Sequence, residues 1–174
     1  MTFSEDRVKG PFSESEAEKI FVDAHGKWGK GTRAERYRTL DKTIFAQISG
    51  QWWIAYNEEN IPVASQGIGE FEGVYLLLGL HSQQTGYGQN TAEYVVSRHS
   101  DKPILGAAKE GGQVIFPRLG FREVKFSDNR IQGEDDLPTE VKSALEIANE
   151  NSELMSIRKL FYRPVASWWV MLSR

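Results

Sequence analysis

The chain has 174 residues, of which 40% are hydrophobic and none is cysteine, and its formal net charge is −3. This length suits a single domain over residues 1–174, and the lack of cysteine excludes disulfides, thiolate metal sites and a cysteine nucleophile. The acidic balance disfavours nucleic acid as a partner. A charged N-terminus and short apolar runs argue against a signal peptide or membrane span, so we expect a cytoplasmic protein.

Two helices are expected before the first strand. Ser13 and Glu16 form a capping-box pattern, and apolar residues then recur at helical spacing over residues 17–28. The loop GKWGKG at residues 26–31 ends this helix, and a second apolar stripe over residues 37–48 predicts another.

The middle of the chain predicts a hairpin followed by a βαβ unit. Residues 51–57 and 61–69 are β-prone and are separated by a short turn. Residues 73–80 (GVYLLLGL) are almost wholly apolar, which predicts a central strand buried on both faces. A helix with one apolar side over residues 92–99 and a short buried strand over residues 103–108 complete the unit.

The C-terminal third predicts further strands and an insertion. Residues 112–119 suggest a short helix interrupted near Pro117, followed by a strand over residues 121–126. The tail, residues 160–172, has strand composition and could pair antiparallel with that strand. Residues 127–160, a polar stretch and then a helix after Pro138, are read as an insertion before the last strand.

A glycine turn lies between the apolar strand and the following helix. Its sequence is Gln83-Gln84-Thr85-Gly86-Tyr87-Gly88. Backbone N–H groups can converge there with the positive end of the helix dipole, which favours phosphate. A plain strand-to-helix turn is the ordinary alternative. The turn lacks the Gly-Lys-Ser/Thr of a Walker A loop and the third glycine of the dinucleotide fingerprint.

These residues resemble the Gcn5-related N-acetyltransferase (GNAT) superfamily. Gln83, Gly86 and Gly88 match its motif A, Q/R-x-x-G-x-G/A, and VIFPRLGF at residues 114–121 resembles its motif B. The resemblance covers roughly residues 13–126 and the last strand. It implies an α/β (α+β) fold with a mixed, splayed central sheet flanked by helices.

The resemblance implies acetyl-CoA as cosubstrate and an N-acyltransferase that transfers an acetyl group to a primary amine. Pantetheine would pair with the strand at residues 76–80 and enter a V-shaped gap beside residues 103–108, while the glycine turn would hold the pyrophosphate. The expected cofactor-binding residues are Leu78, Leu80, Gln83, Gln84, Thr85, Gly86, Tyr87, Gly88 and Phe116.

The catalytic groups stay open. Phe116 stands where many relatives have a tyrosine that protonates the leaving thiolate, so the acid would be Tyr75, Tyr87 or water, or acid catalysis would be absent. Relatives often place a glutamate near the start of the central strand, which points to Glu72 first and Glu70 second as the base. Both glutamates could equally be solvated turn residues. Without cysteine, direct attack by the amine is expected.

Other polar and aromatic residues are weaker candidates. His81 follows the central strand. A histidine in that position more often caps a strand or contacts phosphate than acts as a base, while His25 and His99 look like ordinary helix-end residues. No group of histidine, aspartate and glutamate residues has the spacing typical of metal ligands. Trp52 and Trp53, like Trp168 and Trp169, fit core packing, although one of each pair could serve the acceptor cleft or a homodimer contact.

Two further functions remain. Phe116, together with Gln83 in place of the motif arginine, allows a catalytically degenerate binding or regulatory module of the same fold. Modification of a nucleobase is a third function, which the acidic balance makes less attractive. The acceptor, a small-molecule or protein amine, is not fixed by the sequence, although the acidic stretch at residues 127–136 would suit a cation.

Overall fold

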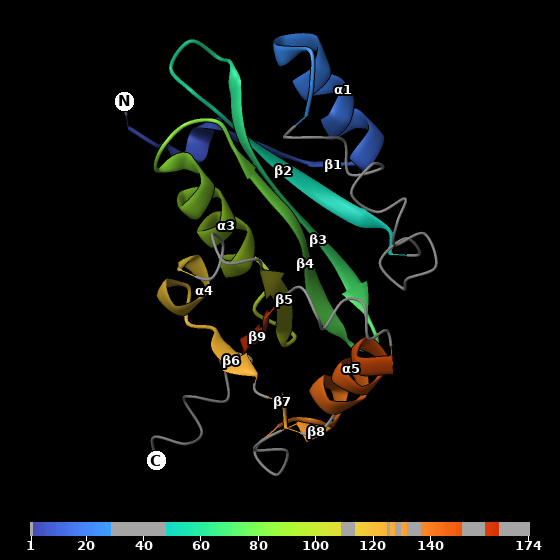
Figure 1. The fold of residues 1–174 in the computed structure, drawn as a ribbon. Helices are drawn as coiled ribbons and strands as arrows, with labels where there is room; N and C mark the ends of the chain where they lie inside the picture. The colour runs from blue at the N-terminus through green and yellow to red at the C-terminus, as the bar shows by residue number, and fades with distance from the viewer. Residues whose placement is uncertain are drawn as a thin grey trace. The chain divides into compact units, whose positions relative to one another are not determined.

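The computed structural model describes residues 2–28, 48–108, 114–124, 126–127, 130–131, 137–150 and 159–163 (Figure 1). The chain divides into two compact units, each considered by itself. The first comprises Met1–Gly69 with Leu78–Arg98, and the second comprises Glu70–Leu77 with His99–Arg174. Two long strands, β3 (Pro62–Phe71) and β4 (Val74–Ser82), contribute residues to both units.

The first unit begins with a short 3-10 helix, η1 (Glu5–Arg7), and a strand that the sequence analysis missed, β1 (Val8–Phe12). This strand pairs antiparallel with β2 (Gly50–Tyr56) and stands at the end of the strand order. The expectation that only helices precede the sheet was therefore wrong. The sequence VKGPF hides the strand because glycine and proline are poor strand formers, which an edge position tolerates.

The first helix, α1 (Glu14–His25), confirms the capping-box prediction. The Glu16 amide donates to the Ser13 hydroxyl at 3.2 Å, and the Ser13 amide donates to the Glu16 carboxylate at 2.7 Å. Gly26 ends the helix in the left-handed region at φ 73°. The second predicted helix, residues 37–48, lies outside the described residues except for Ile48.

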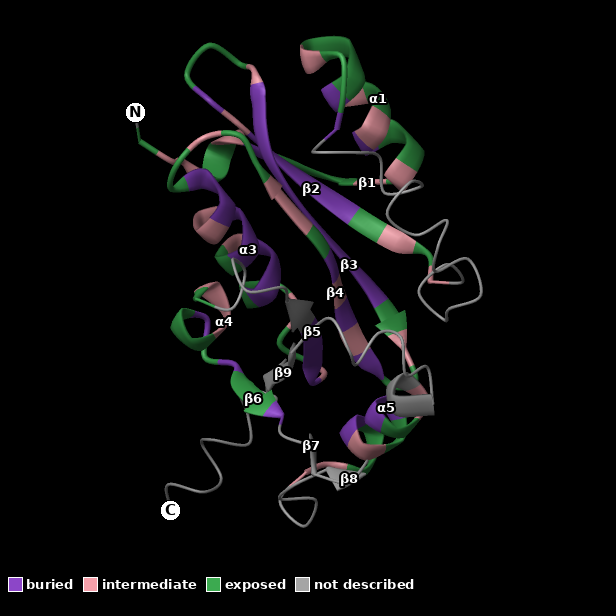
Figure 2. Cartoon of the chain, viewed as in Figure 1, coloured by how far each residue is buried: buried purple, intermediate pink, exposed green. Residues whose placement is uncertain are grey.

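Strands β2 and β3 form the predicted antiparallel hairpin, and both are largely buried (Figure 2). Trp52 pairs with Gly67, and a Cβ on Gly67 would come within 2.7 Å of the Trp52 indole. The glycine is therefore required by the close approach of the ring. Trp52 and Trp53 are both buried, as expected for core residues, whereas Trp168 and Trp169 lie outside the described residues.

Strand β4 differs from the expectation of burial on both faces. Val74, Leu76 and Leu78 are buried, but Tyr75 and Leu77 are only half-buried and Gly79 is exposed. The strand alternates because one of its faces is incompletely covered, which apolar composition alone does not reveal. The helix that follows, α3 (Tyr87–Ser97), ends before His99, so His99 belongs to the next connection and not to the helix.

The second unit holds the start of β4 and the strands β5 (Ile104–Ala108), β9 (Lys159–Arg163) and β6 (Arg122–Val124). β4 and β5 are parallel, as the βαβ prediction requires, and their described register joins Tyr75 to Ile104 and Leu76 to Leu105. β9 pairs antiparallel with β6, as predicted, and also with β5. The last strand therefore lies between β5 and β6.

Helix α4 (Ile115–Arg118) contains Pro117 instead of being interrupted by it. A proline is tolerated in the first turn of a helix, where its missing N–H has no intrahelical partner. The predicted insertion forms a small hairpin, β7 (Phe126–Ser127) with β8 (Arg130–Ile131), and helix α5 (Thr139–Glu150). This helix buries Val141, Ala144 and Leu145. No helix among the described residues is long and apolar enough to cross a bilayer.

Candidate active site

The turn from β4 into α3 lies wholly in the first unit and is held by the fold at its first residue. The Gln83 amide donates to the Val63 carbonyl at 2.8 Å, and the Ser82 hydroxyl donates to the Gln84 carbonyl at 2.8 Å. The first bond ties the turn to strand β3, and the second lies within the turn itself. The Gln83 amide is thus a structural donor and is already occupied.

Gly86 is the N-cap of α3, with φ 86° and ψ −28°, and it supplies no side-chain cap. The first turn of α3 also contains no acidic residue. The first four N–H groups of a helix have no intrahelical carbonyl partner, so they need another acceptor. Within the described residues, the amides of Thr85, Gly86 and Gly88 donate no hydrogen bond. This helix end can therefore donate several N–H groups to an anion.

Glycine suits the two motif positions for different structural reasons. A Cβ on Gly86 would meet no atom within 4 Å, so glycine is favoured there by its positive φ and not by crowding. A Cβ on Gly88 would lie 2.9 Å from the Ser82 Cβ, so Gly88 allows the helix to pack closely on the end of β4. Gly86 therefore permits the backbone conformation of the turn, whereas Gly88 permits close packing of α3 on β4.

The predicted cofactor residues Leu78, Tyr87 and Leu80 have side chains that are at least half-buried. The side chains of Leu78 and Tyr87 are buried, and the Tyr87 ring packs edge-on against Phe3 at 5.9 Å between centroids. The Tyr87 amide contacts the Gln84 carbonyl at 3.3 Å. The side chain of Leu80 is half-buried.

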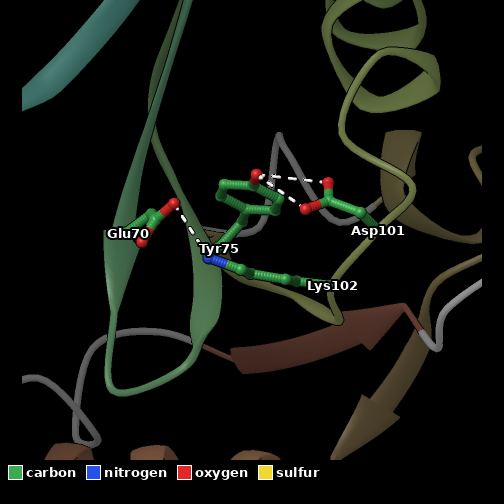
Figure 3. A network of polar contacts seen from close by, with 4 residues as sticks. All are labelled: Glu70, Tyr75, Asp101 and Lys102. Atoms are coloured by element: carbon green, nitrogen blue, oxygen red, sulfur yellow. Dashed lines mark hydrogen bonds and ion pairs between the residues drawn. The ribbon is translucent and has the colours of Figure 1, made fainter.

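A second polar cluster lies in the second unit and includes two of the predicted catalytic residues (Figure 3). The Tyr75 hydroxyl donates to the two carboxylate oxygens of Asp101 at 3.2 and 3.3 Å. The Lys102 ammonium lies 2.9 Å from the Glu70 carboxylate and 5.3 Å from the centroid of the Tyr75 ring. Four side chains from β3, β4 and the connection before β5 therefore form one network.

The electrostatics of this network keep both of its proton donors protonated. Burial and, after it, the hydrogen bond to Asp101 raise the pKa of Tyr75. The hydrogen bond to Glu70 raises the pKa of Lys102. At neutral pH the cluster therefore contains a neutral phenol and a charged ammonium. Sequence reasoning missed Asp101 and Lys102, whose only signal was their position immediately before a buried strand.

Glu72, the favoured base in the sequence analysis, lies at the tip of the β3–β4 hairpin. Its φ is 48° and that of Gly73 is 80°, and its side chain is exposed. Two successive positive φ values are typical of a type I′ hairpin turn. This geometry explains Glu72 as a turn residue, and the structure brings Glu70, not Glu72, together with Tyr75.

The histidines and Phe116 lie in packed surroundings. His81 is a residue of β4 itself, not of the segment after it, and packs edge-on against Phe21 at 5.3 Å. His25 contacts the Pro62 carbonyl at 2.6 Å. The Phe116 ring packs against Phe121 at 4.9 Å and fills the space that a Cβ on Gly106 would need. No metal-ligand cluster is present among the residues the structure describes.

The fold is α+β with a mixed sheet. A glycine turn joins the central strand β4 to helix α3, and the parallel strand β5 follows. An acetyltransferase of the GNAT family from Staphylococcus aureus Mu50 shares this architecture, with a TM-score of 0.50 and 16% identity over 91% of this chain and 99% of that chain. The chain therefore has the GNAT superfamily fold.

Two other solved structures are similar at lower scores. The Bacillus subtilis acetyltransferase in complex with CoA has a TM-score of 0.48 and 10% identity over 91% of this chain and 97% of that chain. Tetrahymena Gcn5 has a TM-score of 0.46 and 12% identity over 87% of this chain and 86% of that chain. No protein-family model and no curated protein sequence matches the chain.

Proposed function

We propose that this chain is an N-acyltransferase that uses acetyl-CoA and transfers the acetyl group to a primary amine. The observation that carries this proposal is the uncapped N-terminus of α3 at Gly86, directly after the central strand of a GNAT fold. Amides of the turn and the helix dipole suit a diphosphate, which is an anionic part of CoA shared by all acyl-CoA molecules. The resemblance of Gln83, Gly86 and Gly88 to motif A supports the same role.

The residues of this turn and of β4 would have different roles in binding the cosubstrate. Thr85, Gly86 and Gly88 would donate backbone N–H groups to the diphosphate, and the absence of a side chain at Gly86 would let it approach. Gln84 would lie beside the diphosphate in the same turn, while Gln83 and Tyr87 would stabilise the conformation of the turn. Leu78 and Leu80 would contribute main-chain groups of β4 to pantetheine. Phe116 would contribute apolar surface to the CoA arm.

The chemistry would be direct attack of the amine on the thioester carbonyl. The chain contains no cysteine that could carry a covalent acyl group. A new C–N bond forms, the C–S bond breaks, and the CoA thiolate leaves and takes a proton from solvent. The acceptor must lose a proton during this exchange. Among the predicted catalytic residues, Tyr75 and Glu70 have neighbours that could assist, whereas Glu72 is the weaker candidate.

A thermal-shift comparison of two thioesters tests the binding half of this proposal. Acetyl-CoA contains the diphosphate, whereas S-acetylpantetheine has the same thioester and pantetheine arm but lacks the diphosphate and the nucleoside attached to it. We expect acetyl-CoA to raise the Tm in a concentration-dependent way, because a ligand that binds the folded state stabilises it, and S-acetylpantetheine to raise it far less. Equal shifts with both compounds would place the binding elsewhere than at the turn.

A thiol-release assay tests the catalytic half. Because the chain has no cysteine, a thiol-reactive dye reports only CoA released from acetyl-CoA, without background from the protein. Release that depends on a primary amine from a panel of small amines and lysine peptides supports an enzyme. Binding of acetyl-CoA without release for any amine would instead support the degenerate binding module.

A further inference from the structure

Gly79 is a strand glycine that neither the backbone nor the packing of the first unit requires. It lies inside β4, where glycine weakens a strand, and its φ is not positive. A Cβ at this position would lie 3.6 Å from Trp52 Cη2, which is an ordinary van der Waals contact, and would meet no other described residue within 4 Å apart from its chain neighbours. Gly79 is also exposed. Since alanine would fit, the effect of the glycine is to keep the space beside it open, as strand glycines do where a ligand approaches closely.

This open position lies on the face of the sheet opposite helix α3. Successive residues of a strand point to opposite faces, and the Leu80 side chain comes within 3.9 Å of the position of a Cβ on Gly88 of α3. Leu80 therefore faces the helix, and position 79 faces the other side, toward Trp52. Gly79 and the Gly86 turn belong to the same segment of the first unit, Leu78–Arg98. The open position and the candidate diphosphate site are thus placed relative to each other.

The Trp52 indole presents its edge, not its face, to this position. Gly67 lies against the ring, because a Cβ there would come within 2.7–2.8 Å of three ring atoms, and Trp28 packs against the ring at 4.8 Å between centroids. The Trp52 atom nearest to position 79 is Cη2, on the edge of the ring. The edge of an aromatic ring is partially positive and packs well on the face of another ring, whereas a cation binds to a ring face. This edge therefore favours an aromatic group over a second ammonium.

The side chains around Trp52 are also aromatic and neutral or weakly basic. Phe21 stacks on Trp28 at 6.1 Å, and His81, two residues after Gly79 on the same strand, packs edge-on against Phe21 at 5.3 Å. The Trp28 indole N–H donates to the Ser65 hydroxyl at 3.1 Å. In the described part of the chain, this ring cluster of Phe21, Trp28, Trp52 and His81 includes no carboxylate that would attract a polyamine.

We propose that the open position beside Gly79, bordered by the Trp52 edge, receives the aromatic group of the acceptor, so that the preferred substrates are arylalkyl primary amines. This inference rests on the N-acyltransferase activity proposed above and names its acceptor class. Pantetheine would pair with main-chain groups of β4, which point along the sheet and not out of its face. The face beside Gly79 is therefore left to the acceptor, and Gly79 determines specificity because it has no side chain.

Urea unfolding of two glycine variants tests the premise without any ligand. We expect Gly79→Ala to unfold at the same or a higher urea concentration than the wild type, because alanine strengthens a strand and meets only an ordinary contact. Gly67→Ala is the matched control and should unfold at a lower urea concentration, because its Cβ collides with the Trp52 ring. A Gly79→Ala midpoint below that of the wild type would show that the fold itself needs this glycine, which overturns the inference.

Thiol release with three amines tests the acceptor class. The amines are 2-phenylethylamine, n-butylamine, which has no ring, and 1,4-diaminobutane, which has a second ammonium. We expect the kcat/KM of the wild type to fall in that order. Gly79→Val fills the open position and should raise the KM for 2-phenylethylamine by about 10-fold or more, with a smaller change for n-butylamine and little change in the KM for acetyl-CoA. A preference of the wild type for 1,4-diaminobutane, or an unchanged KM for 2-phenylethylamine in Gly79→Val, contradicts the inference.

A thermal-shift titration with 2-phenylethylamine separates this inference from the proposed function. We expect the amine to raise the Tm of the wild type more than n-butylamine does, and to raise the Tm of Gly79→Val far less. A wild type that releases no CoA with any amine defeats the proposed function. Equal Tm responses of the wild type and Gly79→Val to 2-phenylethylamine overturn the inference whether or not the protein is an enzyme.

Discussion

Lys102 and Glu70 form an ion pair at 2.9 Å that joins the connection before β5 to the end of β3. Through this pair, one of the two predicted catalytic glutamates is engaged by a cation, and the adjacent Asp101 is left to Tyr75. Because the Glu70 side chain is 64% exposed, solvent screens this pair and we expect it to contribute little to stability.

Replacing Lys102 with Met should barely move the urea unfolding midpoint, because solvent screens an exposed ion pair. The matched control is Lys19→Met, which removes the exposed Lys19–Asp23 pair of α1. In the thiol-release assay, however, Lys102→Met should lower activity and Lys19→Met should not, because only the first change alters the charges around Tyr75. Equal activity in the two variants would argue that the network has no catalytic role.

Substitutions at the two motif glycines should separate binding from packing. Gly86→Ala meets no neighbouring atom but places a side chain at positive φ, so we expect a loss of stability of about 1 kcal/mol and a much weaker Tm response to acetyl-CoA. Gly88→Ala brings a Cβ to 2.9 Å from Ser82 and should cost about 1–3 kcal/mol of unfolding free energy.

Chemical denaturation and thermal shift on both glycine variants check this prediction. A Gly86→Ala protein that responds to acetyl-CoA like the wild type would remove this turn as the diphosphate site. A Gly88→Ala protein as stable as the wild type would mean that β4 and α3 can separate locally.

The raised pKa of Tyr75 predicts a pH dependence of stability at the alkaline end. The native protein holds this phenolic proton more tightly than the unfolded chain does, for which the ordinary pKa is 10.0. The stabilisation is thus fully present below pH 10 and is lost as the pH rises through the native pKa of Tyr75. Urea unfolding between pH 8 and about pH 11 should show a smaller alkaline loss in Tyr75→Phe than in the wild type. Tyr56→Phe should also show a smaller alkaline loss of stability than the wild type, because burial raises the Tyr56 pKa as well.

The capping box of α1 predicts a local stability effect far from the candidate site. Ser13→Ala removes the acceptor of the Glu16 amide and should lower the unfolding free energy by about 1 kcal/mol, whereas Ser13→Thr should retain most of it. Neither change should alter the response to acetyl-CoA. Urea unfolding measures the difference, and a Ser13→Ala midpoint equal to that of Ser13→Thr would show that the cap is dispensable.

Residues close in sequence were predicted well because their patterns are local. The Ser13 and Glu16 spacing fixed the start of α1, and the apolar strand followed by Gly86 and Gly88 predicted the turn into α3. Strand β1 was missed because its proline and glycine conceal an edge strand. The sequence left Glu72 open as a base or as a solvated turn residue, and the positive φ values that place it in the hairpin turn become evident only from the backbone.

The sequence by itself determined the strand–turn–helix unit and the helix caps, since side-chain periodicity and glycine spacing act within a few residues. The GNAT fold was implied by the resemblance of the two motifs to that family. Only the tertiary structure decided that Asp101 receives the Tyr75 hydrogen bond and that Lys102 pairs with Glu70, because the parallel alignment of β4 with β5 brings together residues 26 positions apart. It also decided that β9 lies between β5 and β6. Such pairings depend on strand order, which no local pattern encodes.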